Sequence, residues 1–332
     1  MTTRGDHTKI VIIGFNIGEA GSYVNGPGCC LFNFVNFLKK SDENIKIDIY
    51  CEIPKGRLSR DLEVRSLSDP SLSQSIRSCD VVHLWSGMTQ LQKNALVYAS
   101  HLGKKIIIGP NVIDTVNFDK EQSFLFNGLG DSKINYSKIL TTNDKLNYKI
   151  AKDHRIPLGK IEKFLVGPDI KQWRRSENKG EFILWKGNSK HFVKDVEFAL
   201  RVKEALPQYR FKFFGHPKPY DYLGHIDEAK RAKLYFSTSM SETMGLTLVE
   251  QWACGTPSVT HPKIYMHGEN YKTGIITNKT IEDYCQAITE IMEDESLCKK
   301  LSTGAEEFVK NNFSRKAVLK NYFTILENLG VM

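Results

Sequence analysis

The stretch SETMGLTLVEQWACGTPSVT at 241–260 places one carboxylate before a helix and a second one inside it. We expect the helix to begin near Leu246, so Glu242 precedes it and Glu250 lies roughly 8 Å along its axis. A helix N-terminus presents unpaired N–H groups and a partial positive charge, which suit a diphosphate. The two carboxylates could then accept hydrogen bonds from hydroxyl groups on both sides of that diphosphate. A nucleoside diphosphate sugar has such hydroxyls, on its sugar and on its ribose.

The backbone between the two glutamates also suits an anion. Three amides fall at the expected helix start, those of Met244, Gly245 and Leu246. The glycine lets a ligand approach the backbone closely. Glu250 stands in the apolar stretch LVEQWA, where a solvated charge is not expected. The plainer interpretation is that Glu242 favours the helix dipole and that Glu250 is a surface residue.

Short apolar runs alternate with helical patterns along the whole chain, which predicts parallel βαβ units with both sheet faces covered. In the first half we expect strands at 9–15, 45–51, 80–85, 104–110 and 138–143, and a helix at 29–40. In the second half we expect strands at 181–187, 211–215, 232–239 and 256–260, and helices at 193–206 and from 246 to Gly255. Proline and glycine near 157–168 indicate the boundary. Two doubly wound α/β domains follow, with the cleft between them as the default active site.

The composition is that of a soluble globular protein, with 41% hydrophobic and 25% charged residues among 332. No apolar run approaches the about 18 residues that a membrane span needs, and the N-terminal apolar run indicates a buried strand rather than a signal peptide. The seven cysteines lack metal-ligand spacing, and the adjacent Cys29 and Cys30 fit neither a zinc site nor a redox pair. We interpret them as reduced thiols in a cytoplasmic protein.

The net charge of +8 fits a phosphorylated ligand, an anionic membrane surface or nucleic acid, and equally a solvated basic surface. The basic residues form no dense block, so charge alone selects no partner. The glycines after the first strand, Gly14, Gly18 and Gly21, do not form G-x-G-x-x-G. No acidic residue ends a second strand as a ribose-binding fingerprint requires, so a dinucleotide-dependent oxidoreductase is disfavoured.

The segment ETMGLTLVEQWACGTP at 242–257 resembles the E-x7-E region of the retaining GT-B glycosyltransferases of family four, which runs roughly E-G-F-G-L-x-x-L-E-A-M-A-x-G-x-P-V. The resemblance extends over most of the chain, through segments at 166–173, 222–239, 271–277 and 311–326. It implies a GT-B fold: an N-terminal Rossmann-like acceptor domain at 1–166, a nucleotide-sugar donor domain at 167–312, and a final helix at 313–332 that crosses back to the N-terminal domain.

By this resemblance, Glu242 would contact the donor sugar and act in catalysis, and Glu250 would bind the ribose hydroxyls. The amides at 244–246 would hold the diphosphate or the sugar. Two further segments would complete the donor site. The loop with Gly26 and Gly28 would face the phosphates, unless it is only a tight turn into a helix. Near the base would lie His225 and Ile226.

The family usually carries G-R-x-x-x-x-K-G after the first strand of the donor domain, where the two cations neutralise the diphosphate. This chain has Asn188 at the arginine position, and Lys194 matches the lysine with a shift of one residue. Lys190 or Lys186 could replace the missing charge, because the leaving phosphate gains negative charge. We rank Lys194 first, as a catalytic cation, and Lys190 second. The alternative is that these lysines belong to a solvated helix start.

Acceptor-side residues are harder to predict, because the N-terminal half is the least similar to the family. Where the family often has a histidine, this chain reads GPNVID, with Asn111 as the nearest polar residue. We expect His83 to end a strand and face the cleft as a catalytic residue, although a lone histidine is more often a packed or capping residue. Ser86 and Gly87 are further acceptor-side candidates.

The implied reaction moves a sugar, with retention, from a nucleoside diphosphate sugar (UDP- or GDP-linked) to a hydroxyl of a glycan or lipid-linked glycan. The leaving phosphate would take the acceptor's proton, and positioning and electrostatics would supply catalysis. The sequence has no D-x-D motif, so we expect neither a metal nor a cofactor. Peripheral contact with an anionic membrane stays open.

Three alternatives remain. A modified DNA base as the acceptor would require base extrusion and a steep salt dependence. A GT-B sugar-nucleotide epimerase would use a similar cleft without an acceptor. A non-catalytic nucleotide-sugar binder would bind without turnover, and Asn188 in place of arginine favours it.

Overall fold

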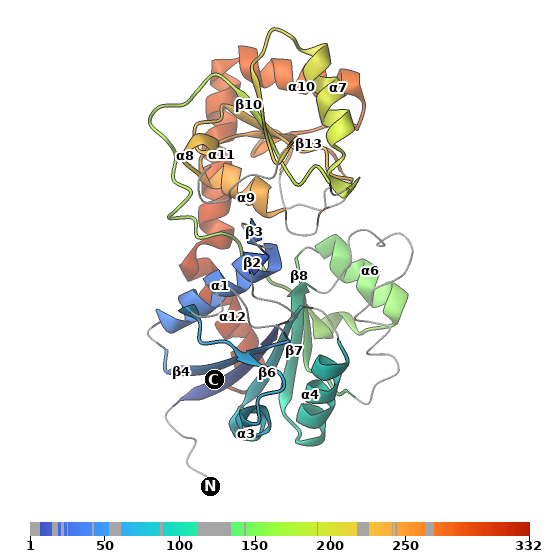
Figure 1. Cartoon of the computed structure of the whole chain (residues 1–332), viewed down its shortest axis with the longest axis vertical. Helices are drawn as coiled ribbons and strands as arrows, with labels where there is room; N and C mark the ends of the chain where they lie inside the picture. Colours follow the sequence, from blue (N-terminus) through green and yellow to red (C-terminus); the bar gives the residue numbers. More distant parts are fainter. Residues whose placement is uncertain are drawn as a thin grey trace. The chain divides into compact units, whose positions relative to one another are not determined.

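A computed structural model describes residues 7–14, 19–20, 23–24, 26–41, 43–52, 61–86, 89–111, 134–142, 144–190, 192–217, 226–240, 242, 245–262 and 269–332. The chain forms two compact units (Figure 1). The first comprises Met1–Val166 with Arg315–Met332, and the second comprises Gly167–Ser314.

The first unit is built on a seven-stranded parallel sheet in the order β5-β4-β1-β6-β7-β8-β9. The strands are β1 (Thr8–Gly14), β4 (Ile45–Cys51), β5 (Arg65–Ser66), β6 (Val81–Ser86), β7 (Lys105–Asn111), β8 (Lys138–Thr141) and β9 (Ile161–Lys163). A short antiparallel pair, β2 (Glu19–Ala20) and β3 (Tyr23–Val24), stands apart from it. The order reverses between β1 and β6, which makes the carboxyl ends of these strands the expected ligand edge of this sheet.

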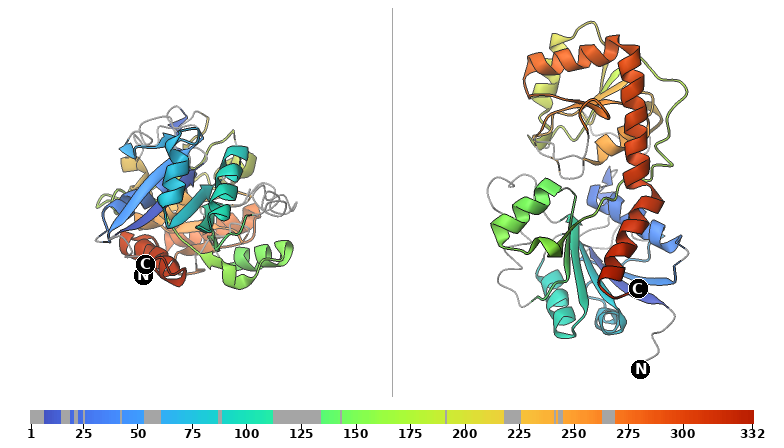
Figure 2. Two further views of the ribbon diagram at one scale, coloured as in Figure 1. Left: turned by 90° about the horizontal axis from the view of Figure 1, so that it is seen from below. Right: turned by 180° about the vertical axis from the view of Figure 1, so that it is seen from behind.

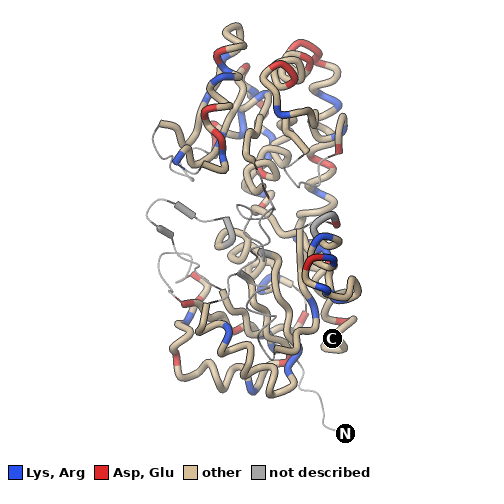
Figure 3. The backbone as a smooth tube through the Cα atoms, turned by 90° about the vertical axis from the view of Figure 1, so that its right-hand side faces the viewer, with Lys and Arg blue, Asp and Glu red and all other residues tan. Residues whose placement is uncertain are grey.

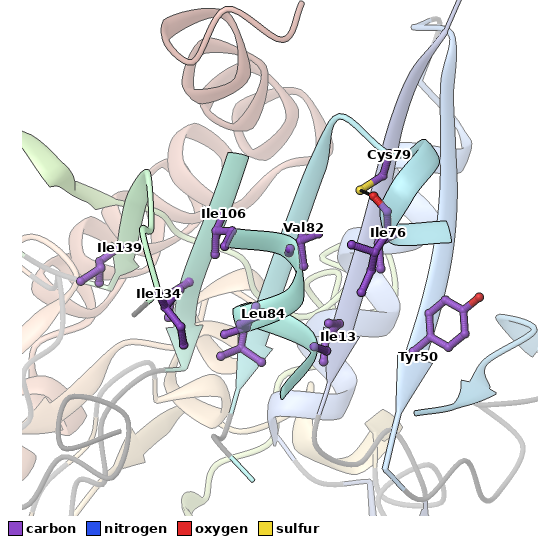
Figure 4. Packing of buried hydrophobic residues seen from close by; sticks show 14 of the residues in the cluster. Ile13, Tyr50, Ile76, Cys79, Val82, Leu84, Ile106, Ile134 and Ile139 are labelled. Atoms are coloured by element: carbon purple, nitrogen blue, oxygen red, sulfur yellow. Dashed lines mark hydrogen bonds between the residues drawn. The ribbon is translucent and has the colours of Figure 1, made fainter. Parts of the chain in front are cut away.

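One face of this sheet packs on α3 (Ser71–Ser78), α4 (Gln90–His101) and α6 (Asp144–His154). Side chains from alternate strand positions form the core there. Figure 4 shows Val82 and Leu84 of β6 near Ile106 of β7 and Ile76 of α3. Successive side chains of a strand point to opposite faces, so the residues between these ones face the other side. The near-continuous apolar strands are those of a sheet that is covered on both faces.

The opposite face packs on α1 (Gly26–Lys39) and on α12 (Arg315–Asn328), which lie side by side. Phe34 of α1 stacks on Trp85 of β6 with ring centroids 5.0 Å apart, and meets Tyr322 of α12 edge-on at 4.8 Å. The side chain of Asn321 donates a hydrogen bond to the Lys163 carbonyl at 3.0 Å. These contacts make α12, the last helix, drawn in red in Figure 2, part of the first unit.

The second unit is built on a five-stranded parallel sheet in the order β11-β10-β12-β13-β14. The strands are β10 (Ile183–Lys186), β11 (Phe211–Phe214), β12 (Leu234–Phe236), β13 (Ser258–Thr260) and β14 (Gly274–Ile276). The helices are α7 (Val196–Ala205), α8 (Ile226–Ala229), α9 (Leu246–Ala253), α10 (Ile281–Glu293) and α11 (Glu295–Phe313). The order reverses between β10 and β12, so the ligand edge of this sheet lies at their carboxyl ends.

Local sequence explains where these helices begin. The Thr280 hydroxyl accepts a hydrogen bond from the Asp283 amide at 3.1 Å and starts α10. The Asp294 carboxylate does the same for α11, accepting from the Leu297 amide at 2.9 Å. Such caps satisfy N–H groups that the helix itself leaves unpaired. Farther along α11, Phe308 meets Trp252 of α9 edge-on at 5.4 Å, which holds α9 in place.

The α/β fold with two doubly wound parallel sheets, expected from the sequence, is confirmed. Most expected strands appear within a residue or two of their predicted bounds. The segment 157–168, expected as a boundary only, contains the 3-10 turn η2 (Leu158–Lys160) and strand β9. The helix expected at 193–206 begins later, at Val196, after the 3-10 turn η3 (Phe192–Lys194).

Charged residues of both signs are interspersed along the described backbone (Figure 3). Within the described ranges, the structure has no helix that is both long enough and apolar enough to cross a membrane.

Candidate functional site

The candidate donor site lies in the second unit, at the carboxyl ends of β10 and β12 and the start of α9. Lys186 is the last residue of β10. Gly245 precedes α9 with φ 50° and ψ 55°, in the left-handed region that glycine adopts without a Cβ clash. Its carbonyl accepts the first helical hydrogen bonds, from the Leu248 and Val249 amides at 2.8 and 3.2 Å. The N-cap residue is a glycine, so no N-cap side chain occupies the first amides of this helix.

A buried ion pair joins β10 to α9. The Lys186 ammonium lies 2.7 Å from the Glu250 carboxylate, and both side chains are 2% exposed. The same ammonium lies 4.7 Å from the ring centroid of buried Trp173. Burial of either charge alone would be strongly unfavourable, so the contact between the two groups offsets their removal from water. Glu250 is therefore a buried residue rather than a solvated one.

A second ion pair, between Lys194 of η3 and Glu242, lies nearer to solvent, with side chains 27% and 20% exposed. Gly187 makes room for the lysine. A Cβ at position 187 would stand 3.2 Å from Lys194 Cγ and 3.1 Å from the Trp185 ring. The aliphatic part of Lys194 therefore passes over a residue that has no side chain, and the ammonium reaches the carboxylate.

The two segments that carry this outer pair are tied together by hydrogen bonds. The Thr238 hydroxyl, after β12, contacts the carbonyls of Lys194 and Asp195 at 2.8 and 3.0 Å. The Met240 amide donates to the Val193 carbonyl at 2.7 Å. These hydrogen bonds hold the turn that carries Lys194 against the loop that leads to Glu242.

Two buried side chains, Tyr284 and His261, fix the loop after β12 by hydrogen bonds to its carbonyl groups. The Tyr284 hydroxyl donates to the Ser237 carbonyl at 2.8 Å, and burial raises the pKa of this phenol, so it stays a donor. The His261 Nε2 group donates to the Ser239 carbonyl at 2.7 Å, since a carbonyl oxygen can only accept. Groups fixed in this way need little reorganisation when a ligand arrives.

Asp195 sets the direction of the chain directly after Lys194. Its φ is 47°, and its carboxylate accepts a hydrogen bond from the Phe198 amide at 3.3 Å as the cap of α7. Its other oxygen lies 2.5 Å from the Lys279 ammonium. An aspartate is one of the few residues besides glycine that tolerate the left-handed region. Our sequence interpretation gave Asp195 no role, although an N-cap pattern at this position could have indicated one.

The other predicted donor residues take simpler positions. Asn188 and Lys190 are exposed, and the Asn188 side chain accepts from the Lys190 amide at 3.1 Å. Leu246 is the first residue of α9, and Ile226 is the half-buried first residue of α8. His225 and Met244 lie outside the described residues.

In the first unit, the predicted phosphate-facing residues Gly26 and Gly28 lie in the first turn of α1, and Gly28 is buried. The predicted acceptor-side residues Ser86 and Asn111 end β6 and β7, where they pair in register across the two strands. Gly87 lies outside the described residues. The roles of these residues stay predictions.

His83 corrects our expectation. It lies within β6 rather than at its end, and it is fully buried. Its Nε2 group donates to the Gly109 carbonyl at 2.8 Å, so Nδ1 is left to accept from the Tyr322 hydroxyl at 3.1 Å. Burial lowers the pKa of His83 to about 4. The ring is a neutral, packed residue that links the sheet to α12, and its two nitrogens already contact protein atoms. This is the plainer role that a lone histidine more often has.

Within the described ranges, the structure contains no cluster of three or more His, Cys, Asp or Glu side chains that could hold a metal ion. The cations in the candidate site come from lysines, and the remaining positive character comes from the N-terminus of α9.

Comparisons with known proteins find sequence similarity in the second unit. Residues 194–308 match the family model described as glycosyl transferases group 1. This span begins at Lys194 and includes both glutamates. A curated relative, the lipopolysaccharide core biosynthesis glycosyltransferase LpsE of Rhizobium meliloti, is 31% identical over 99 residues. That match covers 28% of this chain and 28% of the relative.

Solved structures are similar over nearly the whole chain. HepE of Anabaena in complex with UDP and glucose superposes with a TM-score of 0.69 at 15% identity, covering 98% of this chain and all of that one. The lipopolysaccharide outer core galactosyltransferase WaaB, in its apo form, gives 0.68 at 13%, covering 97% and 99%. An alpha-glucosyltransferase with UDP-glucose and DNA containing an abasic site gives 0.63 at 12%, covering 96% and 99%. The two doubly wound α/β units are those of the GT-B glycosyltransferase fold.

Proposed function

We propose that this protein is a retaining glycosyltransferase that moves a sugar from a nucleoside diphosphate sugar to a hydroxyl acceptor. The observation that carries this proposal is the pair of carboxylates, Glu242 and Glu250, each matched with a lysine at the ligand edge of the second sheet. Neither the start of α9 nor one ion pair would be sufficient alone. Together they offer an anion site with a hydrogen-bond acceptor on each side.

In this proposal the diphosphate lies at the start of α9, where Gly245 allows close approach to the backbone amides. The Lys194 ammonium turns from Glu242 to the phosphate oxygens and stabilises the charge that develops there as the glycosidic bond breaks. Glu242 accepts hydrogen bonds from the sugar, and Glu250 accepts them from the ribose. Asn188, which stands where the resembled family has arginine, leaves Lys194 as the main cation.

In the proposed mechanism the acceptor hydroxyl attacks the face of the sugar that the phosphate leaves, and the configuration of the donor is therefore kept. The acceptor's proton then passes to the leaving phosphate, so no protein base is needed. The lysines and the helix amides supply the positive charge that a metal would otherwise supply, and we propose a metal-independent reaction.

The donor and acceptor classes are proposed from similarity. The solved relatives with UDP favour a uridine diphosphate sugar, with a guanosine diphosphate sugar as the second choice. The names of LpsE and WaaB both refer to lipopolysaccharide, which favours a glycan or lipid-linked glycan as the acceptor. A DNA base remains the alternative acceptor, given the net charge of +8 and the DNA-bound relative.

The experiment is a transfer assay with panels of UDP- and GDP-sugars and of glycan, glycolipid and duplex DNA acceptors. The anomeric configuration of the product would be determined by NMR. We expect transfer to a glycan or glycolipid with the donor's configuration kept. Inversion would contradict the mechanism. Transfer to DNA, at a rate that falls steeply as the salt concentration rises, would show that the acceptor is DNA rather than a glycan, since contacts to phosphates weaken with salt.

A further inference from the structure

Lys186 has a position that the donor reaction as proposed does not use. It ends β10, at the strand where the sheet order reverses, yet its ammonium points to Glu250 of α9 rather than to solvent. The two charged groups are 2.7 Å apart and are both 2% exposed. Lys190 is exposed and Lys194 is partly exposed. Because Lys186 is buried, a diphosphate that arrives from solvent could reach Lys190 and Lys194 but not Lys186.

Trp173 lies on a second side of the same ammonium. Its ring centroid is 4.7 Å from Lys186 Nζ, a distance at which a cation is attracted to an aromatic face. The indole is buried, so it is a fixed surface rather than a mobile one. The ammonium is held between a carboxylate and an aromatic ring, and this restricts where the carboxylate itself can lie.

A carboxylate accepts strong hydrogen bonds from hydroxyls, and a buried carboxylate is stable only when its charge and its oxygen atoms have partners. Glu250 is the residue that would meet the ribose in the proposed function. The ammonium of Lys186 contacts it directly. Its effect on the donor would therefore pass through Glu250.

We propose that Lys186 is a positioning residue for the nucleoside end of the donor, which holds the Glu250 carboxylate toward the ribose hydroxyls, with Trp173 fixing the ammonium. This inference rests on the proposed function. Lys186 therefore does not replace the arginine that the resembled family carries at the position of Asn188, because its ammonium contacts Glu250. The diphosphate then depends on Lys194 and the helix amides.

The test measures the binding of UDP and GDP, and of their 2′,3′-dideoxy forms, by calorimetry. Wild type should prefer the ribose form of whichever nucleotide binds by about tenfold or more, the worth of a hydrogen bond to a charged group. Lys186→Met should lower this preference to below about threefold, and Lys186→Arg should keep part of it.

Lys233→Met is the matched control. Lys233 forms an ion pair of the same 2.7 Å length with Glu181 in the same unit, but its partner is 74% exposed. Exposed pairs contribute little, so this variant should keep both its stability and its preference for ribose.

A double variant distinguishes the positioning role of Lys186 from a purely structural one. Removal of one member of a buried pair destabilises a protein, whereas replacement of both by apolar side chains is often neutral. Lys186→Met with Glu250→Leu should therefore melt close to wild type while showing the same loss of ribose preference as either single variant. Equal, non-additive losses are the mark of one shared contact.

A folded Lys186→Met that still prefers ribose as wild type does would overturn the positioning role and leave the glycosyltransferase proposal intact. A wild type that binds UDP or GDP without distinguishing the dideoxy form would overturn the positioning role as well, together with the ribose contact proposed for Glu250. A wild type that binds neither nucleotide would contradict the proposed function itself, and this inference with it.

Discussion

The ammonium of Lys194 contacts the carboxylate of Glu242, and this ion pair connects the turn after β10 with the loop after β12. Both side chains are partly exposed, so a ligand can reach them and compete for the contact. The pair offsets the charge of Glu242 and holds the Lys194 ammonium beside that carboxylate.

Lys194→Met should reduce turnover by about a hundredfold to a thousandfold, the usual effect of removing one group that stabilises developing charge. Donor binding should change less, because the helix amides remain. Steady-state kinetics with a transferred sugar would measure both. Lys190→Met removes an exposed lysine from the same loop and should change turnover little. Equal effects of the two substitutions would contradict the special role of Lys194.

Gly187→Ala should impair the enzyme through Lys194 rather than by direct contact with the donor. The added methyl group would stand 3.2 Å from Lys194 Cγ, which requires a shift of a few tenths of an ångström. A displacement of 1 Å in a catalytic group can lower a rate by about a hundredfold, so we expect a loss of about tenfold here. Kinetics of Gly187→Ala in the Lys194→Met background give the check. The alanine should have almost no further effect once Lys194 is absent.

The pKa of His83 predicts a loss of stability in mild acid. Burial lowers its pKa from an ordinary value of 6.5 to about 4, so between these pH values the unfolded chain binds a proton that the folded chain does not. Stability from this residue is complete above about pH 6.5 and falls as the pH falls toward 4, by about 2–3 kcal/mol. His83→Gln cannot titrate. Melting curves of both proteins should therefore diverge between pH 7.5 and 4.5, with wild type losing more; parallel curves would contradict the assignment.

Gly304 of α11 allows a close approach of backbone. A Cβ there would stand 2.1 Å from the Lys272 carbonyl oxygen. Alanine normally favours a helix over glycine by about 1 kcal/mol. The overlap should outweigh this and destabilise the protein by about 1–3 kcal/mol. Thermal unfolding would show it against Gly159→Ala, a position where a Cβ meets nothing within 4 Å. A Gly304→Ala protein as stable as wild type would be the contrary result.

The sequence predicts much of this architecture because its signals are local. The run KIVIIGF is typical of a buried strand in a sheet covered on both faces, and it forms β1. The start of α9 follows from Gly245 and the apolar stretch after it, and the end follows from Gly255, which has φ 63°. These features depend on neighbours in the chain, so one sequence is enough to find them.

The partners of the charged residues could not be predicted in this way. Lys186 and Glu250 lie far apart in the chain, and they meet because the fold brings the last residue of β10 into contact with α9. His83 has the sequence setting of a ligand-facing strand end, but the register of β6 with β7 brings it to Gly109, and α12 brings Tyr322 to it. Such contacts depend on packing between distant segments, which periodicity does not encode.

The most direct test of the central claim is a donor screen. The protein would be incubated with UDP-, GDP-, ADP- and CMP-sugars, and release of free nucleotide would be followed for wild type, Glu242→Ala and Glu250→Ala. We predict slow release from one donor, lost in both variants, with binding of that donor weakened most by Glu250→Ala. Absence of both release and binding for every donor, or release that both variants retain, would contradict the assignment of the two glutamates to a nucleotide-sugar site.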